Sequence, residues 1–191
     1  MAELPFNPKN LDSNDKLIYD TLVEKRKSVG APFDGPYAAL MNHPELCQKV
    51  EALGYYLKFQ GHLPRNIYQF VVLSVAQSTK AVFEWTDHVD HALAAGVPEI
   101  VIDTLKTQGL SNQQFPEPYH LAAQVLNAAL VWKNIPIEVQ SEAIKAYGIY
   151  GYVELVVLSG FYQMFSAINQ GFDVSLRAKG GQHNFHEIPK K

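Results

Sequence analysis

The sequence contains almost no cysteine and no cluster of positive charge. Cys47 is the single cysteine among 191 residues, so the chain can form neither an intrachain disulfide nor a Cys-x-x-Cys redox pair. The net charge is −3 at pH 7. Nucleic-acid binding usually requires a clustered basic face, and membrane-surface binding a basic amphipathic segment. We therefore expect neither partner.

Two further features that direct a chain to or across a membrane are missing from the sequence. The first ten residues, MAELPFNPKN, lack the charged start and apolar run of a secretory signal. The most apolar segment, residues 152–168, is interrupted by Glu154, Ser159 and Gln163 and is too short to cross a bilayer comfortably. Together with the single cysteine, these absences predict a cytoplasmic protein.

The alternation of apolar and polar residues that marks strands is also missing, and helical spacing runs through most of the chain. A first helix is predicted from Ser13 towards Gly30, and others begin at Pro44, Pro64 and Pro98. Hydrophobic residues make up 47% of the chain and charged residues 18%, which is typical of a globular domain. We predict an all-α protein of about eight or nine helices, with one domain over residues 1–175 and a mobile tail over 176–191.

One predicted helix, Phe83 to Gly96, carries three side chains that could perform chemistry. At about 100° per residue, Glu84, His88 and His91 fall together on the flank between an apolar face and a polar face. Side chains on such a boundary are partly desolvated, which moves their pKa values.

Three interpretations of this flank remain open. Glu84 and His88 could form an acid–base pair one helical turn apart, with the carboxylate fixing the imidazole tautomer. Glu84, His88 and His91 could instead bind a divalent metal ion, although no other histidine is an obvious fourth ligand. The third interpretation is a solvated helix edge on which Asp87 and His91 form one more exposed pair.

Other residues have both a functional and a structural interpretation. Arg65, in a first helical turn, could bind a substrate carboxylate or remain solvated. Trp85 could stack on a substrate, but it falls on the apolar face and suits the core. Tyr162 could point its hydroxyl into a pocket. Glu154 suits the first turn of the apolar helix and could also form a buried contact between subunits.

The segment LPRNIYQFVVLSVAQSTKAVFEWTDHVDHALAAGVPEIVI, together with the later GYVELVVLSGFYQMFSAINQGF, resembles the carboxymuconolactone decarboxylase family. The resemblance covers about residues 36–174 and implies the alkylhydroperoxidase D (AhpD)-like helical fold. It also implies a homo-oligomer, commonly a trimer or hexamer, with pockets near the subunit interfaces. The apolar final helix is consistent with an oligomer, because a monomer would leave it uncovered.

Peroxidases of this fold use a Cys-x-x-Cys-x-x-x-His motif, whose residues fall on Ala81, Glu84 and His88 in this sequence. Dithiol peroxidase chemistry is therefore excluded, since both thiols are missing. Family members also usually carry a Glu at the position of Gln69, and a glutamine cannot accept the proton.

The resemblance implies decarboxylase-type acid–base chemistry, without a cofactor, on a small organic acid or carboxylated lactone. His88 would supply a proton or stabilise developing charge, Glu84 would orient it, and Gln69 would donate a hydrogen bond. Arg65, Trp85, Tyr162 and His91 are the candidate substrate-binding residues. A redox relative without dithiol chemistry and a non-catalytic ligand-binding oligomer are the alternatives.

Overall fold

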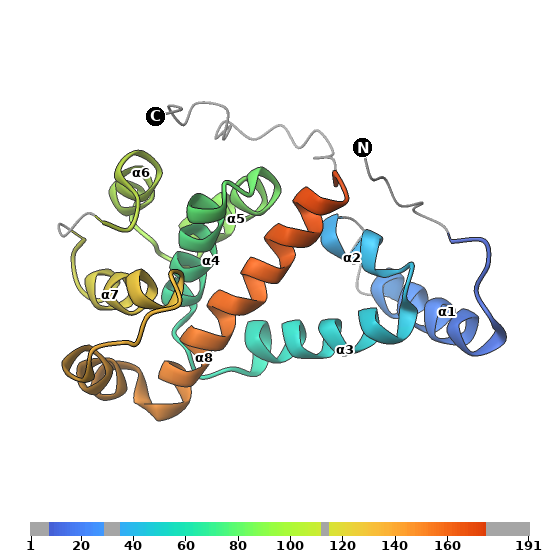
Figure 1. The fold of residues 1–191 in the computed structure, drawn as a ribbon, viewed down its shortest axis with the longest axis horizontal. Coiled ribbons are helices and arrows are strands. Elements are labelled where there is room, and N and C mark those ends of the chain that lie inside the picture. The colour runs from blue at the N-terminus through green and yellow to red at the C-terminus, as the bar shows by residue number, and fades with distance from the viewer. Residues whose placement is uncertain (1–7, 29–34, 112–114, 175–191) are drawn as a thin grey trace.

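The computed structural model describes residues 8–28, 35–111 and 115–174, and they form a helical assembly without any strand (Figure 1). The predicted tail, residues 176–191, lies outside this range. The elements in chain order are α1 (Ser13–Ser28), α2 (Gly35–Leu40), α3 (Pro44–Tyr55), the π-helical turn η1 (Tyr56–Gln60), α4 (Arg65–Thr79), α5 (Val82–Ala94), α6 (Glu99–Gln108), α7 (Tyr119–Ala129) and α8 (Ile137–Gly171). The all-α prediction is confirmed.

Prolines begin the helices where the sequence predicted them. Pro44 is the first residue of α3, and Pro64 and Pro98 are the N-caps of α4 and α6. Proline suits these positions because the first backbone N–H groups of a helix have no partner within the helix. The segment before Pro44 also contains the six-residue helix α2.

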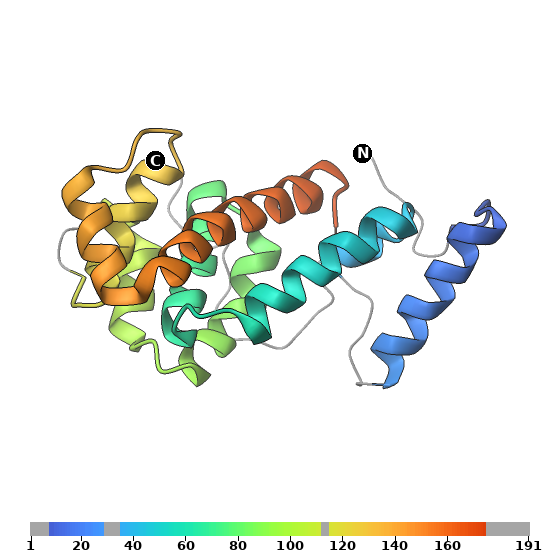
Figure 2. The ribbon, with the colours of Figure 1, turned by 90° about the horizontal axis from the view of Figure 1, so that it is seen from below.

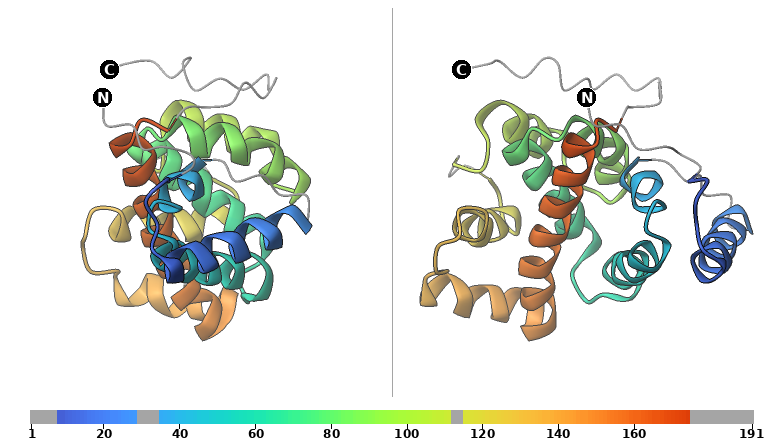
Figure 3. Two further views of the ribbon diagram at one scale, coloured as in Figure 1. Left: turned by 90° about the vertical axis from the view of Figure 1, so that its right-hand side faces the viewer. Right: turned by 45° about the vertical axis from the view of Figure 1, so that its right-hand side comes forward.

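Helix α4 lies at the centre of the molecule. It contacts α5, α6, α7 and α8, and the views in Figures 1 and 3 show these helices around it. Every residue from Ile67 to Ala76 is buried. A helix buried on all its faces cannot leave its polar side chains to water. Of the polar residues in this segment, Ser74 donates a hydrogen bond to the Phe70 carbonyl. Gln69 pairs its Oε1 in the interior, while its Nε2 has no partner among the described residues.

Helix α8 is two helices joined at Gly148, where the backbone adopts φ +71° and ψ 165°. Glycine accepts this conformation because it has no Cβ. Figure 2 shows the longer second part crossing the molecule. By length and composition α8 could cross a bilayer, but half of its most apolar window is buried inside the protein.

The carboxylate of Glu154, in the second part of α8, fixes the chain just before α4. It accepts hydrogen bonds from the backbone N–H groups of His62 (2.6 Å) and Leu63 (2.9 Å) and from the Tyr56 hydroxyl (3.2 Å). Burial alone would raise the pKa of Glu154, but the hydrogen bonds outweigh it and lower the pKa. These partners belong to the same chain, so the contact holds η1 and α4 to α8.

We expect Glu154→Gln to lower the free energy of unfolding by about 2 kcal/mol, because hydrogen bonds to a charged acceptor contribute about 1.5–3 kcal/mol each. Urea unfolding at pH 7 measures this loss. Glu142→Gln, an exposed position on α8, is the matched control and should be neutral. Equal stability of the two variants would contradict the role given to Glu154.

Candidate active site

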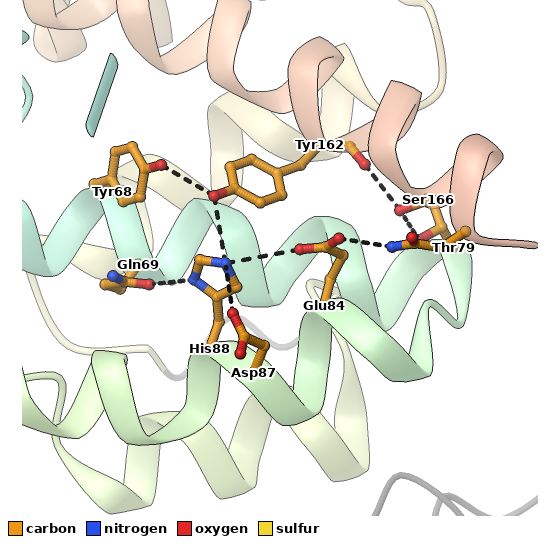
Figure 4. Close-up of polar contacts among 9 residues, drawn as sticks. Tyr68, Gln69, Thr79, Glu84, Asp87, His88, Tyr162 and Ser166 are labelled. Atoms are coloured by element: carbon orange, nitrogen blue, oxygen red, sulfur yellow. Dashed lines mark hydrogen bonds and ion pairs between the residues drawn. The ribbon is translucent and has the colours of Figure 1, made fainter. Parts of the chain in front are cut away.

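The site lies where α4, α5 and α8 meet in the interior. Helix α5 supplies Glu84 and His88, α4 supplies Gln69, and α8 supplies Tyr162 (Figure 4). Glu84 is 3% exposed and His88 5% exposed. The interpretation of these two residues as a solvated helix edge is therefore wrong, because α4 and α8 cover this side of α5.

The two ring nitrogens of His88 have different partners. Nδ1 lies 2.9 Å from Gln69 Oε1, and because a carbonyl oxygen can only accept, Nδ1 carries the proton. The other nitrogen, Nε2, lies 3.3 Å from the Tyr162 hydroxyl and 3.7 Å from Glu84 Oε2. Burial lowers the pKa of His88 well below its ordinary value, which keeps the ring neutral. Nε2 is therefore a proton acceptor facing a hydroxyl and a carboxyl group.

Glu84 has the opposite shift. Burial raises the pKa of its carboxyl group to about 8, although a hydrogen bond from Asn169 Nδ2 to Oε1 (2.7 Å) acts against this rise. The group is thus mostly protonated at neutral pH. The site holds a carboxylic acid next to a neutral imidazole, which is the reverse of the usual Glu⁻/His⁺ pair.

This arrangement changes the roles that the sequence suggested. Gln69 accepts a hydrogen bond from His88 through Oε1. Its buried Nε2 has no partner among the described residues, so the predicted donor role of Gln69 stays a prediction. Gln69 fixes the tautomer of His88, a role that was predicted for Glu84. The hydroxyl groups of Tyr162 and Tyr68 form a hydrogen bond of 3.0 Å, so two phenols extend the polar network.

Glu84 and His88 face a cavity of about 160 Å³. Its wall includes six aromatic rings, those of Tyr37, Tyr68, Phe83, Phe161, Tyr162 and Phe165. The charged side chains in the wall are Arg26, Lys58 and Asp87. A cavity of about 150 Å³ is large enough for benzene. The volume therefore suits a ligand with a single small ring, held among aromatic side chains beside an acid.

Gly54 of α3 keeps this cavity open. A Cβ at this position would lie 2.6 Å from the Tyr37 hydroxyl and 3.0 Å from the Phe161 ring. Both of these side chains line the cavity together with Gly54. Any larger residue would push one of the rings, so the glycine sets the distance between α3 and α8.

Three of the predicted substrate-binding residues do not line the cavity. Arg65 is exposed and donates a hydrogen bond to the Lys58 carbonyl. Its guanidinium carbon lies 4.4 Å from the centre of the Tyr68 ring. Trp85 is fully buried in the core, as its apolar helix face allows. His91 is exposed in the last turn of α5, with its ring centroid 5.8 Å from that of His88.

Other residues at the cavity were not among the predicted site residues. The third interpretation placed Asp87 in an exposed pair with His91, yet Asp87 lies in the wall with Oδ2 4.0 Å from His88 Nε2. Tyr68 of α4 and Lys58 of η1 also lie in the wall, and Asn169 of α8 adjoins it through its hydrogen bond to Glu84. The family resemblance includes an Asn near the end of the segment GYVELVVLSGFYQMFSAINQGF. This was the one signal in the sequence that could have pointed to Asn169.

The metal-ion interpretation needs Glu84, His88 and His91 together. Within residues 8–28, 35–111 and 115–174, no group of three His, Cys, Asp or Glu side chains is arranged to hold a metal ion. His91 points into solvent while Glu84 is buried, so the three side chains do not converge.

Comparison with known proteins gives a likeness in fold. No family model matches the sequence, and no curated protein matches it significantly. The structure is similar to a crystal structure from Agrobacterium tumefaciens, of a protein of unknown function provisionally described as the antioxidant defence protein AhpD. The TM-score is 0.61 at 19% sequence identity, over 73% of this chain and 96% of that one. The chain has an AhpD-like fold.

The AhpD-like fold does not bring thiol chemistry to this chain. Cys47 lies on α3 in the core, and burial raises the pKa of its thiol to about 12. A thiol with such a pKa is protonated at neutral pH and is a poor nucleophile. The groups next to the cavity are instead a carboxylic acid and an imidazole, which are side chains able to give and accept protons.

Proposed function

We propose that this AhpD-like protein is an acid–base lyase of the carboxymuconolactone decarboxylase type, acting on a small carboxylated lactone or a related organic acid. One observation carries the proposal: a protonated carboxyl group and a neutral imidazole share an aromatic cavity of ring size. Enzymes use pairs of titratable groups with displaced pKa values as acid and base.

In the proposed reaction, the bond between the substrate carbon and its carboxylate breaks and carbon dioxide leaves. The electron pair stays on that carbon and is delocalised into a neighbouring carbonyl group. Glu84 then gives its proton to the carbon, directly or through His88 Nε2, and is reprotonated from solvent. The Tyr162 hydroxyl, supported by Tyr68, hydrogen-bonds the oxygen on which charge develops.

The test is to incubate the protein in D₂O with a panel of small unsaturated lactone carboxylates and follow carbon dioxide release and deuterium at the former carboxyl carbon. The proposal predicts one deuterium per carbon dioxide released. Tight binding without either product would support the non-catalytic ligand-binding alternative and overturn the proposal. Release of carbon dioxide without deuterium at that carbon would show that no proton is delivered there and would contradict the proposed step.

A homo-oligomer and a cytoplasmic location remain part of this proposal. An exposed apolar stripe along α8 supports the oligomer. Its members repeat at alternating spacings of three and four residues: Tyr150, Val153, Val157, Gly160, Met164 and Ala167. Such a stripe is typical of the seam between packed helices. Light scattering at micromolar concentration should give a multiple of 21.4 kDa, and the mass of one chain would contradict it.

A further inference from the structure

Lys58 belongs to the π-helical turn η1, which joins the end of α3 to the loop before α4. Single π-helical turns are rare and occur frequently at functional sites. In this turn Tyr56 and Phe59 are exposed, whereas Lys58 is half-buried and lines the cavity that contains Glu84 and His88. Leu57 packs into the core, and Lys58 is the residue of this turn that reaches the cavity wall.

The other cation of the cavity, Arg26, is already engaged. Its Nε lies 3.4 Å from Glu51 Oε1, and its guanidinium group stacks 4.1 Å from the centre of the Tyr37 ring. The Lys58 ammonium group lies 5.4 Å from the centre of the exposed Phe59 ring. Unlike Arg26, it has no carboxylate of the described chain within 4.0 Å. Asp87 is the acidic group that acts on Lys58 from across the cavity wall, and Arg65 and Arg26 repel it.

A half-buried ammonium group among aromatic rings is stabilised when an anion pairs with it. Burial lowers the pKa of Lys58, which shows that its charge loses solvation in this position. The cavity has room for one small ring beside this group. An aromatic wall, one cation at its edge and a proton donor next to them fit an organic acid that carries its carboxylate on a small ring.

We propose that Lys58 is the carboxylate-binding residue of this cavity and holds the ligand while Glu84 and His88 reach its other end. The substrate class rests on the proposed function. Ion pairing stabilises a carboxylate in the ground state, and stabilisation of the ground state does not accelerate its loss. The carboxylate on Lys58 is therefore a group that the reaction retains, and the bond that breaks lies nearer to Glu84.

Benzoate is the probe for this proposal, because it has the ring size and the carboxylate but cannot react. Titration calorimetry at pH 7 should give binding to the full-length protein, weakening as sodium chloride is added. In Lys58→Met the affinity should fall about tenfold or more, since a charge-assisted hydrogen bond is lost. Its remaining affinity should depend less on salt than that of the wild type, because Arg26 is still present in the wall. Lys58→Arg should bind within about threefold of wild type, because the positive charge is kept.

Lys49→Met is the matched control, since Lys49 is exposed on α3 and paired with Glu45, away from the cavity. It should bind benzoate like the wild type. The same affinity in Lys58→Met and Lys49→Met, or no benzoate binding to the wild type at millimolar concentration, would overturn the proposal. Benzoate does not react, so this result is independent of whether Glu84 transfers a proton. Failure of the decarboxylation assay alone would leave the Lys58 site standing.

Discussion

Glu84→Gln is expected to abolish most of the loss of stability that the wild-type protein shows as the pH rises. An unfolded glutamate ionises near pH 4.5, whereas the folded Glu84 carboxyl group has a pKa of about 8. Below pH 4.5 both states hold the proton and there is no penalty. Between these two values only the unfolded chain loses it, so the free energy of unfolding falls as the pH rises.

The size of this effect follows from the shift. One pKa unit corresponds to about 1.4 kcal/mol, so the wild type should lose about 4 kcal/mol relative to Glu84→Gln between pH 5 and pH 9. The glutamine keeps an oxygen to accept from Asn169 and has no proton to lose. The measurement is urea unfolding of both proteins at pH 5, 7 and 9.

His88 must be considered in the same experiment. Its folded pKa is lowered, so its contribution is fully present above pH 6.5 and is lost as the pH falls below that value. This term is common to both proteins and largely cancels in their difference. Glu142→Gln, an exposed change of the same type, should run parallel to the wild type at every pH. A Glu84→Gln curve that also runs parallel would show that Glu84 is ionised in the folded protein.

His88→Gln is expected to reduce the rate of proton transfer to the substrate by about 10²–10⁴-fold, which is the usual contribution of a positioned acid or base. Glutamine can still hydrogen-bond Gln69 and Tyr162, so circular dichroism and thermal unfolding should remain close to the wild type. Rates of deuterium incorporation in D₂O, normalised to bound ligand, measure the loss.

His91→Gln is the matched control, because this imidazole lies one turn further along α5 and is exposed. Its rate should stay within about twofold of the wild type. The wild-type rate should also fall above a pH of about 8, where Glu84 loses its proton, and Glu84→Gln should lack this limb. A His88→Gln protein with an unchanged rate would remove His88 from the mechanism.

The features of the fold that are encoded locally could be predicted from the sequence. Pro44, Pro64 and Pro98 mark helix starts because each lacks a backbone N–H, and Gly148 separates two helices because it accepts a positive φ. The spacing of Glu84 and His88 likewise follows from helix geometry alone. These signals require no knowledge of which helices become neighbours.

The rest of the site depends on packing between helices that are distant in the sequence. Asp87 and His91 both belong to α5, yet the first lines the cavity and the second is exposed, because neighbouring helices cover only part of α5. The partners of His88 lie 19 and 74 residues away. Helix periodicity gives the direction in which a side chain points but not what it meets, so the neutral state of His88 could not be foreseen.

Helix α1 has a consequence for how quickly molecules enter and leave the interior. It contributes Arg26 to the cavity wall, yet Leu22 is its only buried residue. Lys25 and Arg26 tie it to Glu51 through partly solvated ion pairs. We expect α1 to separate from the rest of the protein at a lower free energy than the interior helices, because these ion pairs hold it in place. The residence time of a bound ligand should therefore shorten as ionic strength increases, while Glu84 and His88 in the interior keep their geometry.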